Sequence, residues 1–362
     1  FDAGAVISAS HNPYPDNGIK FFDSNGYKLP DEVEDELEKY VRQSADNELA
    51  RPTGDGIGKI EFNSNLAHLY AHFVRHTIDT SLEGLTIVYD GANGAASSVG
   101  PEILSGLGAK VININVNPDG LNINHHCGST HIEGLQVAVQ QHNADLGIAN
   151  DGDADRCFVV DEKGQPVSPS AICGIVAERY LAQKPGGTII HNLITSKAVP
   201  EIIEENGGTP VRTRVGHSFI KAKMAETGAI FGGEHSAHYY FTEFFNADSG
   251  MLAAMHVLAA LGHQNKPLSE MMAAYNRYEA SGEINSRVAD QKESTQQVLD
   301  AFADRIDSID TLDGVTVQLK GTPAWFNVRG SNTEPLLRLN VEAPTRAEVD
   351  ALVDEILGII RR

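Results

Sequence analysis

A serine beside a histidine near the amino terminus is the first place in this chain where chemistry can be expected. Ser10 and His11 follow the apolar run 5–7 and come just before Pro13. A strand that ends there leaves a hydroxyl at a strand-to-loop junction, because proline cannot continue the strand. That position suits a nucleophile. The alternative is an ordinary turn, since serine and asparagine favour turns for local reasons.

A run of alternating aspartates is the second such place. Asp151, Asp153 and Asp155 are separated by small residues and follow the apolar segment 146–149. Carboxylates spaced in this way can converge on one cation, which relieves their mutual repulsion. Because all the ligands are oxygens, the expected ion is Mg²⁺. The alternative is an acidic surface turn.

Two other chemistries compete for the same aspartates. An EF-hand would explain Glu162 at the twelfth position, but the sixth position must be glycine and is Arg156. The flanking segments 146–149 and 157–160 are strand-like, which also argues against an EF-hand. An aspartyl phosphatase would use Asp151, the first carboxylate after the strand, as its nucleophile. This second alternative remains open.

Three later loops are also rich in polar groups. The segment 212–218 concentrates cationic side chains in an acidic protein. If the segment after residue 233 is extended, Glu234, Ser236 and His238 share one face and suit sugar hydroxyls. The turn 329–335 combines a guanidinium, hydroxyls and an amide, which suits a phosphate dianion. Each loop alone could be an ordinary turn.

Alternating strands and helices are predicted to position these loops. Segment 85–89 is β-branched and leads through a glycine loop into a small-residue helix, which is the start of a βαβ unit. Segments 188–191 and 197–205 repeat the pattern. A helix that begins near residue 31 carries Val33, Leu37 and Val41 on one apolar stripe, which we expect to be buried.

The last part of the chain has a different pattern. Segments 316–319, 324–328 and 337–341 predict an antiparallel sheet with one solvated face. A capping box at residues 345–348 begins a final amphipathic helix. A shorter helix is expected at 269–278. The fold class is therefore α/β with a smaller α+β region at the carboxyl end.

Composition limits the function. The 362 residues include 28 basic and 49 acidic side chains, a net charge of −21, so nucleic acid is not an expected partner. No apolar run is long enough for a membrane span, and no signal peptide is visible. Three cysteines, at positions 127, 157 and 173, form no metal-binding or redox pair, which favours buried reduced thiols in a cytoplasmic protein.

Together, the serine loop, the aspartate loop, the segment 233–238 and the turn 329–335 resemble the four signature loops of the α-D-phosphohexomutase superfamily, in its order. This resemblance implies three related α/β/α domains and a smaller C-terminal α+β domain around a central cleft. The first domain would lack its start, because about fifty residues precede the linker near residue 54. The implied domains are 1–54, 55–165, 166–281 and 282–362.

The resemblance also implies roles for individual residues. Ser10 would be the phosphorylated serine, and its phosphate would hold Mg²⁺ together with Asp151, Asp153 and Asp155. By position, His11 and Lys20 correspond to the general acid and base. The implied substrate-binding residues are Arg156, Lys197, Gly216, His217, Glu234, Ser236, His238, Arg329, Ser331, Asn332 and Thr333. The reaction would pass through a hexose 1,6-bisphosphate.

The preferred hexose phosphate is predicted from two positions. Phosphoglucosamine mutases usually have glycine in place of Asn332 and glutamine in place of His235, so the resemblance favours the phosphomannomutase/phosphoglucomutase branch and mannose phosphates. Phosphoglucomutase and phosphoglucosamine mutase remain alternatives. Ala237 departs from the branch, which commonly has glycine there. A sugar-phosphate binding module without turnover is also considered, and the oligomeric state is not predicted.

Overall fold

The structure is a computed structural model, which describes residues 1–45, 52–262, 266–331 and 334–361. Its internal contacts divide the chain into two compact units. Unit 1 comprises Phe1–Pro166 and Glu243–His263, and unit 2 comprises Val167–Thr242 and Gln264–Arg362. Within the described ranges, no helix combines the length and the apolar character that crossing a membrane requires.

Unit 1 begins with a two-stranded hairpin. Strands β1 (Gly4–Ile7) and β2 (Ile19–Phe22) pair antiparallel, so the serine loop joins their ends. Helix α1 (Asp31–Ala45) follows. The expectation of a buried stripe on this helix is wrong, because Val33 is 38% exposed and Val41 is 63% exposed. The described residues of this unit leave that face of α1 open to solvent.

The main sheet of unit 1 has the order β4-β3-β5-β6. Its first three strands are parallel and the last is antiparallel. The strands are β3 (Thr86–Asp90), β4 (Lys110–Ile114), β5 (Leu146–Ala149) and β6 (Phe158–Asp161). The helices are α2 (Asn65–Arg75), α3 (Ala96–Gly106), α4 (Glu133–His142) and α8 (Gly250–Gly262), with short elements η1 (Gly54–Gly56), η2 (Gly128–Thr130) and β11 (Ala247–Asp248).

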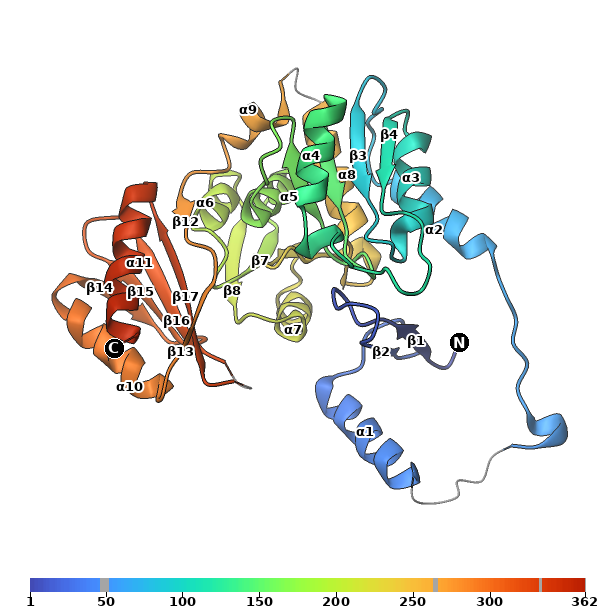
Figure 1. Cartoon of the computed structure of the whole chain (residues 1–362), viewed down its shortest axis with the longest axis horizontal. Coiled ribbons are helices and arrows are strands. Elements are labelled where there is room, and N and C mark those ends of the chain that lie inside the picture. The colour runs from blue at the N-terminus through green and yellow to red at the C-terminus, as the bar shows by residue number, and fades with distance from the viewer. Residues whose placement is uncertain (46–51, 263–265, 332–333, 362) are drawn as a thin grey trace. The chain divides into compact units, whose positions relative to one another are not determined.

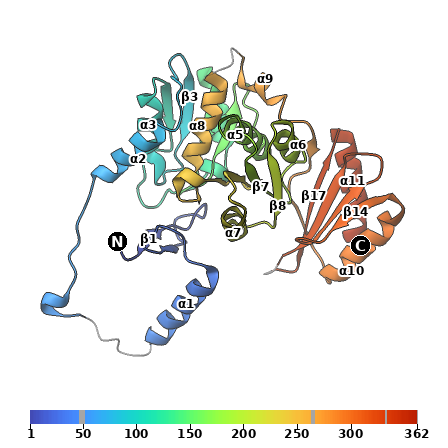
Figure 2. The same cartoon turned by 180° about the vertical axis from the view of Figure 1, so that it is seen from behind.

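Helices cover both faces of this sheet. Val88 packs in one core with Leu135 and Val139 of α4. The next residue, Tyr89, points to the other face, where its hydroxyl lies 3.9 Å from the sulfur of Met251 in α8. Consecutive strand residues face opposite sides, so α4 and α8 lie on opposite faces, as Figures 1 and 2 show. The carboxyl ends of β3 and β5 are left to carry the polar loops.

Unit 2 begins with a second helix-covered sheet. Strands β8 (Thr209–Thr213), β7 (Thr188–Asn192) and β9 (Phe231–Gly233) are parallel, and β10 (Tyr239–Phe241) pairs antiparallel with β9. Its helices are α5 (Pro169–Gln183), α6 (Ala198–Glu205), α7 (His217–Thr227) and α9 (Leu268–Met272), with η3 (Thr242–Phe244) after β10. The helix expected at 269–278 is therefore only the short α9, because the chain turns before Tyr278.

The rest of unit 2 is an antiparallel sheet backed by two helices. The sheet order is β12-β17-β16-β15-β14, and β13 also pairs with β17. The elements are β12 (Glu279–Ala280), β13 (Ile284–Arg287), α10 (Gln291–Phe302), η4 (Ala303–Arg305), β14 (Ile306–Asp310), β15 (Val315–Leu319), β16 (Trp325–Gly330), β17 (Leu336–Ala343) and α11 (Arg346–Ile360). The predicted capping box is confirmed at Thr345 and Glu348.

The second face of this sheet is not solvated as expected. Trp325, Asn327 and Glu342 are all buried. On this face, the Glu342 carboxylate accepts hydrogen bonds from the Trp325 indole and from the backbone N–H of Lys197, both at 2.8 Å. The Lys197 loop of the same unit therefore covers the polar face.

The three cysteines are buried and form no disulfide, as predicted. Burial raises the pKa of the Cys127 thiol to about 11 and those of Cys157 and Cys173 to about 12. Such thiols stay protonated and are poor nucleophiles.

Candidate functional site

Ser10 lies in the loop that joins β1 to β2. Its backbone φ is 56°, in the left-handed region where residues other than glycine are uncommon. The Ser10 Oγ atom donates to Asp151 Oδ2 over 3.4 Å and lies 3.3 Å from His11 Nδ1. The structure therefore brings the predicted nucleophile, the neighbouring imidazole and the first carboxylate together. Backbone strain of this kind is concentrated at functional sites.

The three aspartates occupy the loop between β5 and β6, so the strand-like flanks that argued against an EF-hand are confirmed. One carboxylate oxygen from each of Asp151, Asp153 and Asp155 lies within 4.8 Å of the others. Asp151 is fully buried. Burial, followed by the charges of Asp155 and Asp153, raises its pKa to about 7, although Arg156 opposes the rise.

Two cations partly balance this charge. The Lys20 ammonium lies 2.7 Å from Asp153 Oδ2 and 3.2 Å from Asp155 Oδ2. Burial works to lower the pKa of Lys20, but the two carboxylates outweigh it and the pKa is raised. The Arg156 Nε atom lies 3.5 Å from Asp151 Oδ2. The aspartate loop and Lys20 of β2 thus bring three carboxylates and two cations together.

The donor set of this loop fits a divalent metal ion. Asp153 Oδ1 is buried and accepts no hydrogen bond from any residue that the structure describes. A buried carboxylate oxygen normally has a partner, so this atom suits a ligand. Three carboxylates offer only oxygen, the donor that Mg²⁺ prefers.

Two residues that the sequence reasoning missed hold the serine loop in place. Ser8 Oγ donates to Asp153 Oδ2 over 2.6 Å and accepts from the Ser10 backbone N–H over 2.8 Å. Asn124 Nδ2 donates to the carbonyls of Ser10 and Asn12 at 3.0 and 2.9 Å. The bond from the Ser10 N–H to the hydroxyl of the serine two residues before it is a serine turn, and this local pattern was an available signal for Ser8. No sequence signal points to Asn124.

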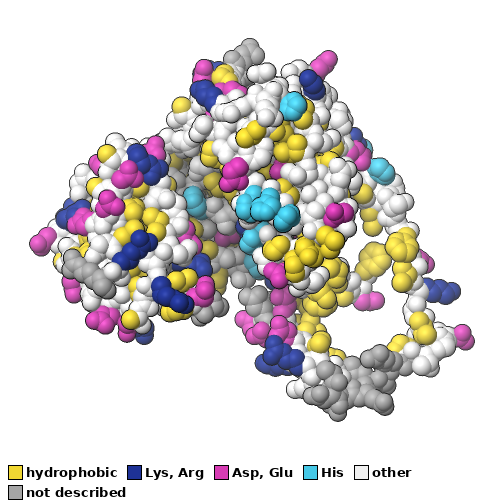
Figure 3. All heavy atoms as spheres, viewed as in Figure 1, with side chains coloured by type: hydrophobic (Ala, Val, Ile, Leu, Met, Phe, Trp, Pro, Cys, Tyr) yellow, Lys and Arg dark blue, Asp and Glu magenta, His cyan; other side chains and the backbone are white. Residues whose placement is uncertain are grey.

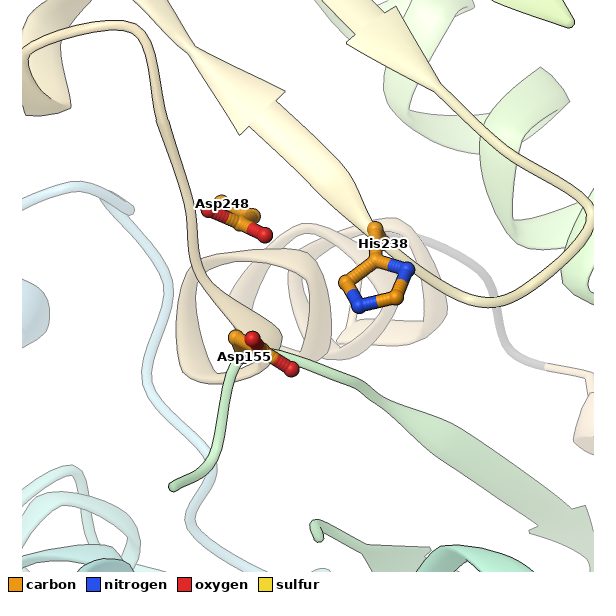
Figure 4. Close-up of side chains that lie close together, drawn as sticks. All are labelled: Asp155, His238 and Asp248. Carbon is orange, nitrogen blue, oxygen red and sulfur yellow. The ribbon is translucent and has the colours of Figure 1, made fainter. Parts of the chain in front are cut away.

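A further acidic side chain lies beside the loop. Asp248, in β11, has a carboxylate oxygen within 4.8 Å of one from Asp155, and Figure 4 shows both side chains. Asp153, Asp155 and Asp248 border a cavity of about 350 Å³ together with apolar side chains such as Tyr70 and Phe244. The aspartate loop therefore borders a space whose other lining residues are mostly apolar.

Glu234 is the centre of the polar group in unit 2. Its side chain is only 2% exposed. Its carboxylate accepts hydrogen bonds from the Tyr240 hydroxyl at 2.7 Å, the Gly216 backbone at 3.0 Å and the Asn192 amide at 3.3 Å. The loops after β7, β8 and β9 thus meet at one carboxylate.

The segment that carries Glu234 is a tight hairpin, so the expectation of an extended segment is wrong. Glu234 N–H donates to the His238 carbonyl at 2.9 Å, and Ala237 has φ of 67°. The turn nevertheless keeps the three predicted side chains together. Ser236 Oγ lies 3.0 Å from His238 Nδ1, which is 3.8 Å from Glu234 Oε2.

The remaining predicted residues of unit 2 are placed around these loops. Asp313 Oδ2 accepts from the Arg329 guanidinium at 3.2 Å and from the Val215 backbone at 3.4 Å, and therefore links the turn 329–335 to the segment 212–218. His217 begins α7, directly after Gly216. Ser331 is buried. Asn332 and Thr333 lie outside the described residues.

The predicted site residues thus form two groups, one in each unit. The first, in unit 1, contains Ser10, His11, Lys20, Asp151, Asp153, Asp155 and Arg156. The second, in unit 2, contains Lys197, Gly216, His217, Glu234, Ser236, His238, Arg329 and Ser331. The roles assigned to them, and the domain boundaries, stay predictions.

Family models match almost the whole chain. They are phosphoglucomutase/phosphomannomutase α/β/α domains I, II and III and the C-terminal domain, at residues 1–48, 66–164, 168–278 and 283–359, respectively. The chain belongs to the phosphoglucomutase/phosphomannomutase family. The fold class predicted from the signature loops, with three α/β/α domains and a smaller final domain, is therefore confirmed.

Curated relatives match along the full chain. The phosphoglucosamine mutase of Lactobacillus helveticus is 38% identical over 100% of this chain and 78% of its own length. That of Symbiobacterium thermophilum is 40% identical over 99% of this chain and 78% of its own length. These names favour the glucosamine alternative and do not support the predicted preference for mannose phosphates.

Solved structures show the same fold. A family protein from Burkholderia thailandensis has a TM-score of 0.83 at 26% identity and covers 100% of this chain and 77% of its own. The Aspergillus fumigatus N-acetylphosphoglucosamine mutase, solved with GlcNAc-6P and magnesium, has a TM-score of 0.72 at 17% identity over 99% of this chain and 88% of its own. At that identity the second likeness concerns the fold alone.

Proposed function

We propose that this family member is a phosphoglucosamine mutase, which interconverts glucosamine 6-phosphate and glucosamine 1-phosphate. Phosphorylated Ser10 gives its phosphoryl group to the free hydroxyl of the sugar monophosphate. The Ser10 oxygen–phosphorus bond breaks as the new one forms, which yields a hexosamine 1,6-bisphosphate. The bisphosphate turns round, and its other phosphoryl group returns to Ser10 as the product leaves.

The placement of the Ser10 hydroxyl beside the aspartate loop carries the proposed chemistry. Ser10 Oγ is 3.4 Å from Asp151 Oδ2 although the two residues are 141 positions apart. A nucleophile next to a metal-binding carboxylate group is the arrangement that phosphoryl transfer needs. The bound Mg²⁺ would neutralise charge on the phosphoryl oxygens, and Asp151, Asp153 and Asp155 would hold it.

Lys20 and His11 are the proposed proton-transfer residues. Lys20 is protonated at neutral pH and lies 2.7 Å from Asp153 Oδ2, so it is the proposed proton donor to a leaving oxygen. Against the effect of burial, the carboxylates of Asp155 and Asp153 raise its pKa, which makes it a weak acid unless a bound cation takes over these carboxylates. His11 Nδ1, 3.3 Å from Ser10 Oγ, is suited to receiving the Ser10 proton in the return step, when the Ser10 hydroxyl attacks the bisphosphate.

The unit 2 group would recognise the sugar phosphate. A carboxylate held by three donors, such as Glu234, is rigid and suits sugar hydroxyls. Arg329 makes ion pairs with Asp313 and Glu283 at 3.2 and 3.3 Å. A substrate phosphate dianion would therefore compete with these two carboxylates for the guanidinium.

The sugar assignment is supported by the relatives' names, which agree on glucosamine at 37–40% identity. It can be tested by incubating the chain with Mg²⁺, a catalytic amount of hexose 1,6-bisphosphate and one sugar 6-phosphate at a time, followed by ³¹P NMR. We expect kcat/KM for glucosamine 6-phosphate to exceed those for mannose and glucose 6-phosphates at least tenfold. Faster conversion of mannose 6-phosphate would overturn the sugar assignment, and no conversion of any of the three would overturn the mutase.

Mapping of the phosphorylated residue separates the mutase from its two rivals. An acid-stable phosphate on Ser10 is expected for the mutase. An acid-labile phosphate on Asp151 would instead identify an aspartyl phosphatase. Sugar-phosphate binding with no phosphorylated residue and no product would identify a binding module.

A further inference from the structure

Three exposed histidines gather on one loop of unit 1. His125, His126 and His131 lie between β4 and α4, outside the Ser10 and aspartate loops. The ring centroids of His125 and His126 are 4.3 Å apart, and those of His126 and His131 are 5.5 Å apart. Figure 3 shows one cluster of histidine side chains, in cyan, near the middle of the face in view, and further histidines apart from it.

We propose that these three imidazoles form a binding site for a borderline transition-metal ion, of the class of Zn²⁺ or Cu²⁺. Imidazole nitrogen is a preferred ligand of such ions and a poor one for Mg²⁺. The site is therefore chemically distinct from the oxygen-only aspartate loop. It is independent of the proposed mutase activity.

The spacing of the rings fits such an ion. A metal–nitrogen distance of about 2.0 to 2.1 Å and tetrahedral angles place the centres of two coordinating rings about 5 Å apart. Two of the three ring separations, 4.3 and 5.5 Å, lie on either side of that value. The nitrogens of the three rings do not all lie within 4.8 Å of one another in the described structure, so the side chains must turn to share one ion. Rotation about the side-chain bonds of exposed residues is enough to aim the nitrogens at a common point.

The backbone explains why two consecutive side chains can serve one ion. In an extended chain, neighbouring residues point to opposite sides. His126 has φ of 54°, in the left-handed region, and this turn brings its ring next to that of His125. The left-handed region is uncommon for residues other than glycine, although histidine is one of the types enriched there.

The loop is held in place before any ion binds. His125 N–H donates to the Asn122 carbonyl at 3.2 Å, and His131 N–H donates to the Gly128 carbonyl at 3.2 Å. Gly128 N–H in turn donates to Asp90 at 3.1 Å. A site on an anchored backbone loses less entropy when it binds an ion.

The ring nitrogens are available for a ligand. Among the described residues, none makes a hydrogen bond or ion pair with the three imidazoles, and all three are exposed. The net charge of −21 raises the local concentration of cations. Water can complete the coordination of an ion on such a surface.

The proposal is tested with Cu²⁺ on the full chain in excess Mg²⁺, which occupies the oxygen ligands. Electron paramagnetic resonance of one added equivalent should show nitrogen hyperfine coupling, and Zn²⁺ calorimetry should give one site per chain. Each of His126→Asn and His131→Asn should weaken Zn²⁺ binding at least about tenfold, because losing a ligand costs more than losing its support. Asparagine is chosen at position 126 because it tolerates the positive φ found there, so the variant should keep the fold of the loop.

Two control variants make the result decisive. His142→Asn removes an exposed imidazole at the far end of α4 and should leave binding unchanged. His72→Asn removes one ring of a stacked pair on α2, whose partner His76 is 4.1 Å away. If binding is lost in the α2 variant, or is unchanged in both loop variants, or no nitrogen coupling appears, the proposed site does not exist.

Discussion

Ser8→Ala tests whether the Ser10 loop is held for catalysis. Ser8 Oγ makes two hydrogen bonds, one to the Asp153 carboxylate at 2.6 Å and one from the Ser10 N–H at 2.8 Å. Alanine removes both and leaves the backbone free to relax. The Ser10 φ of 56° then loses one of the contacts that maintain it.

The expected loss of activity in Ser8→Ala can be worked out from these two hydrogen bonds. A hydrogen bond to a charged group contributes about 1.5–3 kcal/mol and a neutral one about 0.5–1.5 kcal/mol. Ser8 is only partly buried, so water replaces part of each bond. We therefore expect the loss of both bonds to raise the activation free energy by about 1–2 kcal/mol, which corresponds to a fall of about 5- to 30-fold in kcat. The KM for the sugar phosphate should change little, because Ser8 contacts the nucleophile loop.

The assay is the Mg²⁺-dependent mutase rate with glucosamine 6-phosphate, measured beside the midpoint of thermal unfolding. Ser24→Ala is the matched control, because Ser24 is exposed in a turn of the same region. It should retain full activity. A Ser8→Ala protein as active as the control would refute the reasoning that these two bonds position Ser10.

Three further predictions concern stability and are measured by urea unfolding. Gly100→Ala should destabilise unit 1 by about 1–3 kcal/mol, because its Cβ would collide with the buried Tyr89 ring. Tyr240→Phe should cost about 1.5–3 kcal/mol, because the buried Glu234 carboxylate loses a 2.7 Å donor. Burial, with a smaller effect of Arg212, lowers the pKa of His191 to about 4 from an ordinary 6.5, so the unfolded chain binds the proton first as pH falls. The free energy of unfolding should therefore be about 1 kcal/mol lower at pH 5.5 than above pH 6.5, and His191→Leu should remove that difference.

The controls for the first two variants make the same substitution at positions without the contact. Gly134→Ala, in α4, should be neutral or slightly stabilising, because its Cβ meets no atom within 4 Å. Tyr27→Phe should be neutral, since that tyrosine is exposed. If a variant and its control lose the same free energy of unfolding, the named contact does not account for the loss.

The aspartate loop was predictable because its signal is local. A buried strand fixes the direction in which the chain leaves the sheet, and alternate acidic residues then share one side of a short loop. Asp151, Asp153 and Asp155 follow this rule, and their oxygens lie within 4.8 Å of one another. The final helix was predictable for the same reason, since its capping box lies within four residues.

Contacts between distant segments were not predictable from one sequence. Asn124 reaches Ser10 across 114 positions, and nothing in the residues around it indicates a partner. The exposed Val33 and Val41 illustrate the same limit, because periodicity predicts an apolar face but not the surface that covers it. The hairpin at Glu234 depends on Ala237, whose φ of 67° is not a conformation that alanine favours.

The relatives' names do not support the predicted preference for mannose, and the structure at His235 shows why this position is a weak indicator of the sugar. This position was used as an indicator of the sugar, yet the imidazole Nδ1 lies 3.1 Å from Ser170 Oγ in α5, and Ser170 Oγ also accepts from the Ser196 backbone. Burial lowers the pKa of His235, so it is a neutral packing residue. Its identity therefore reflects how the hairpin packs on α5.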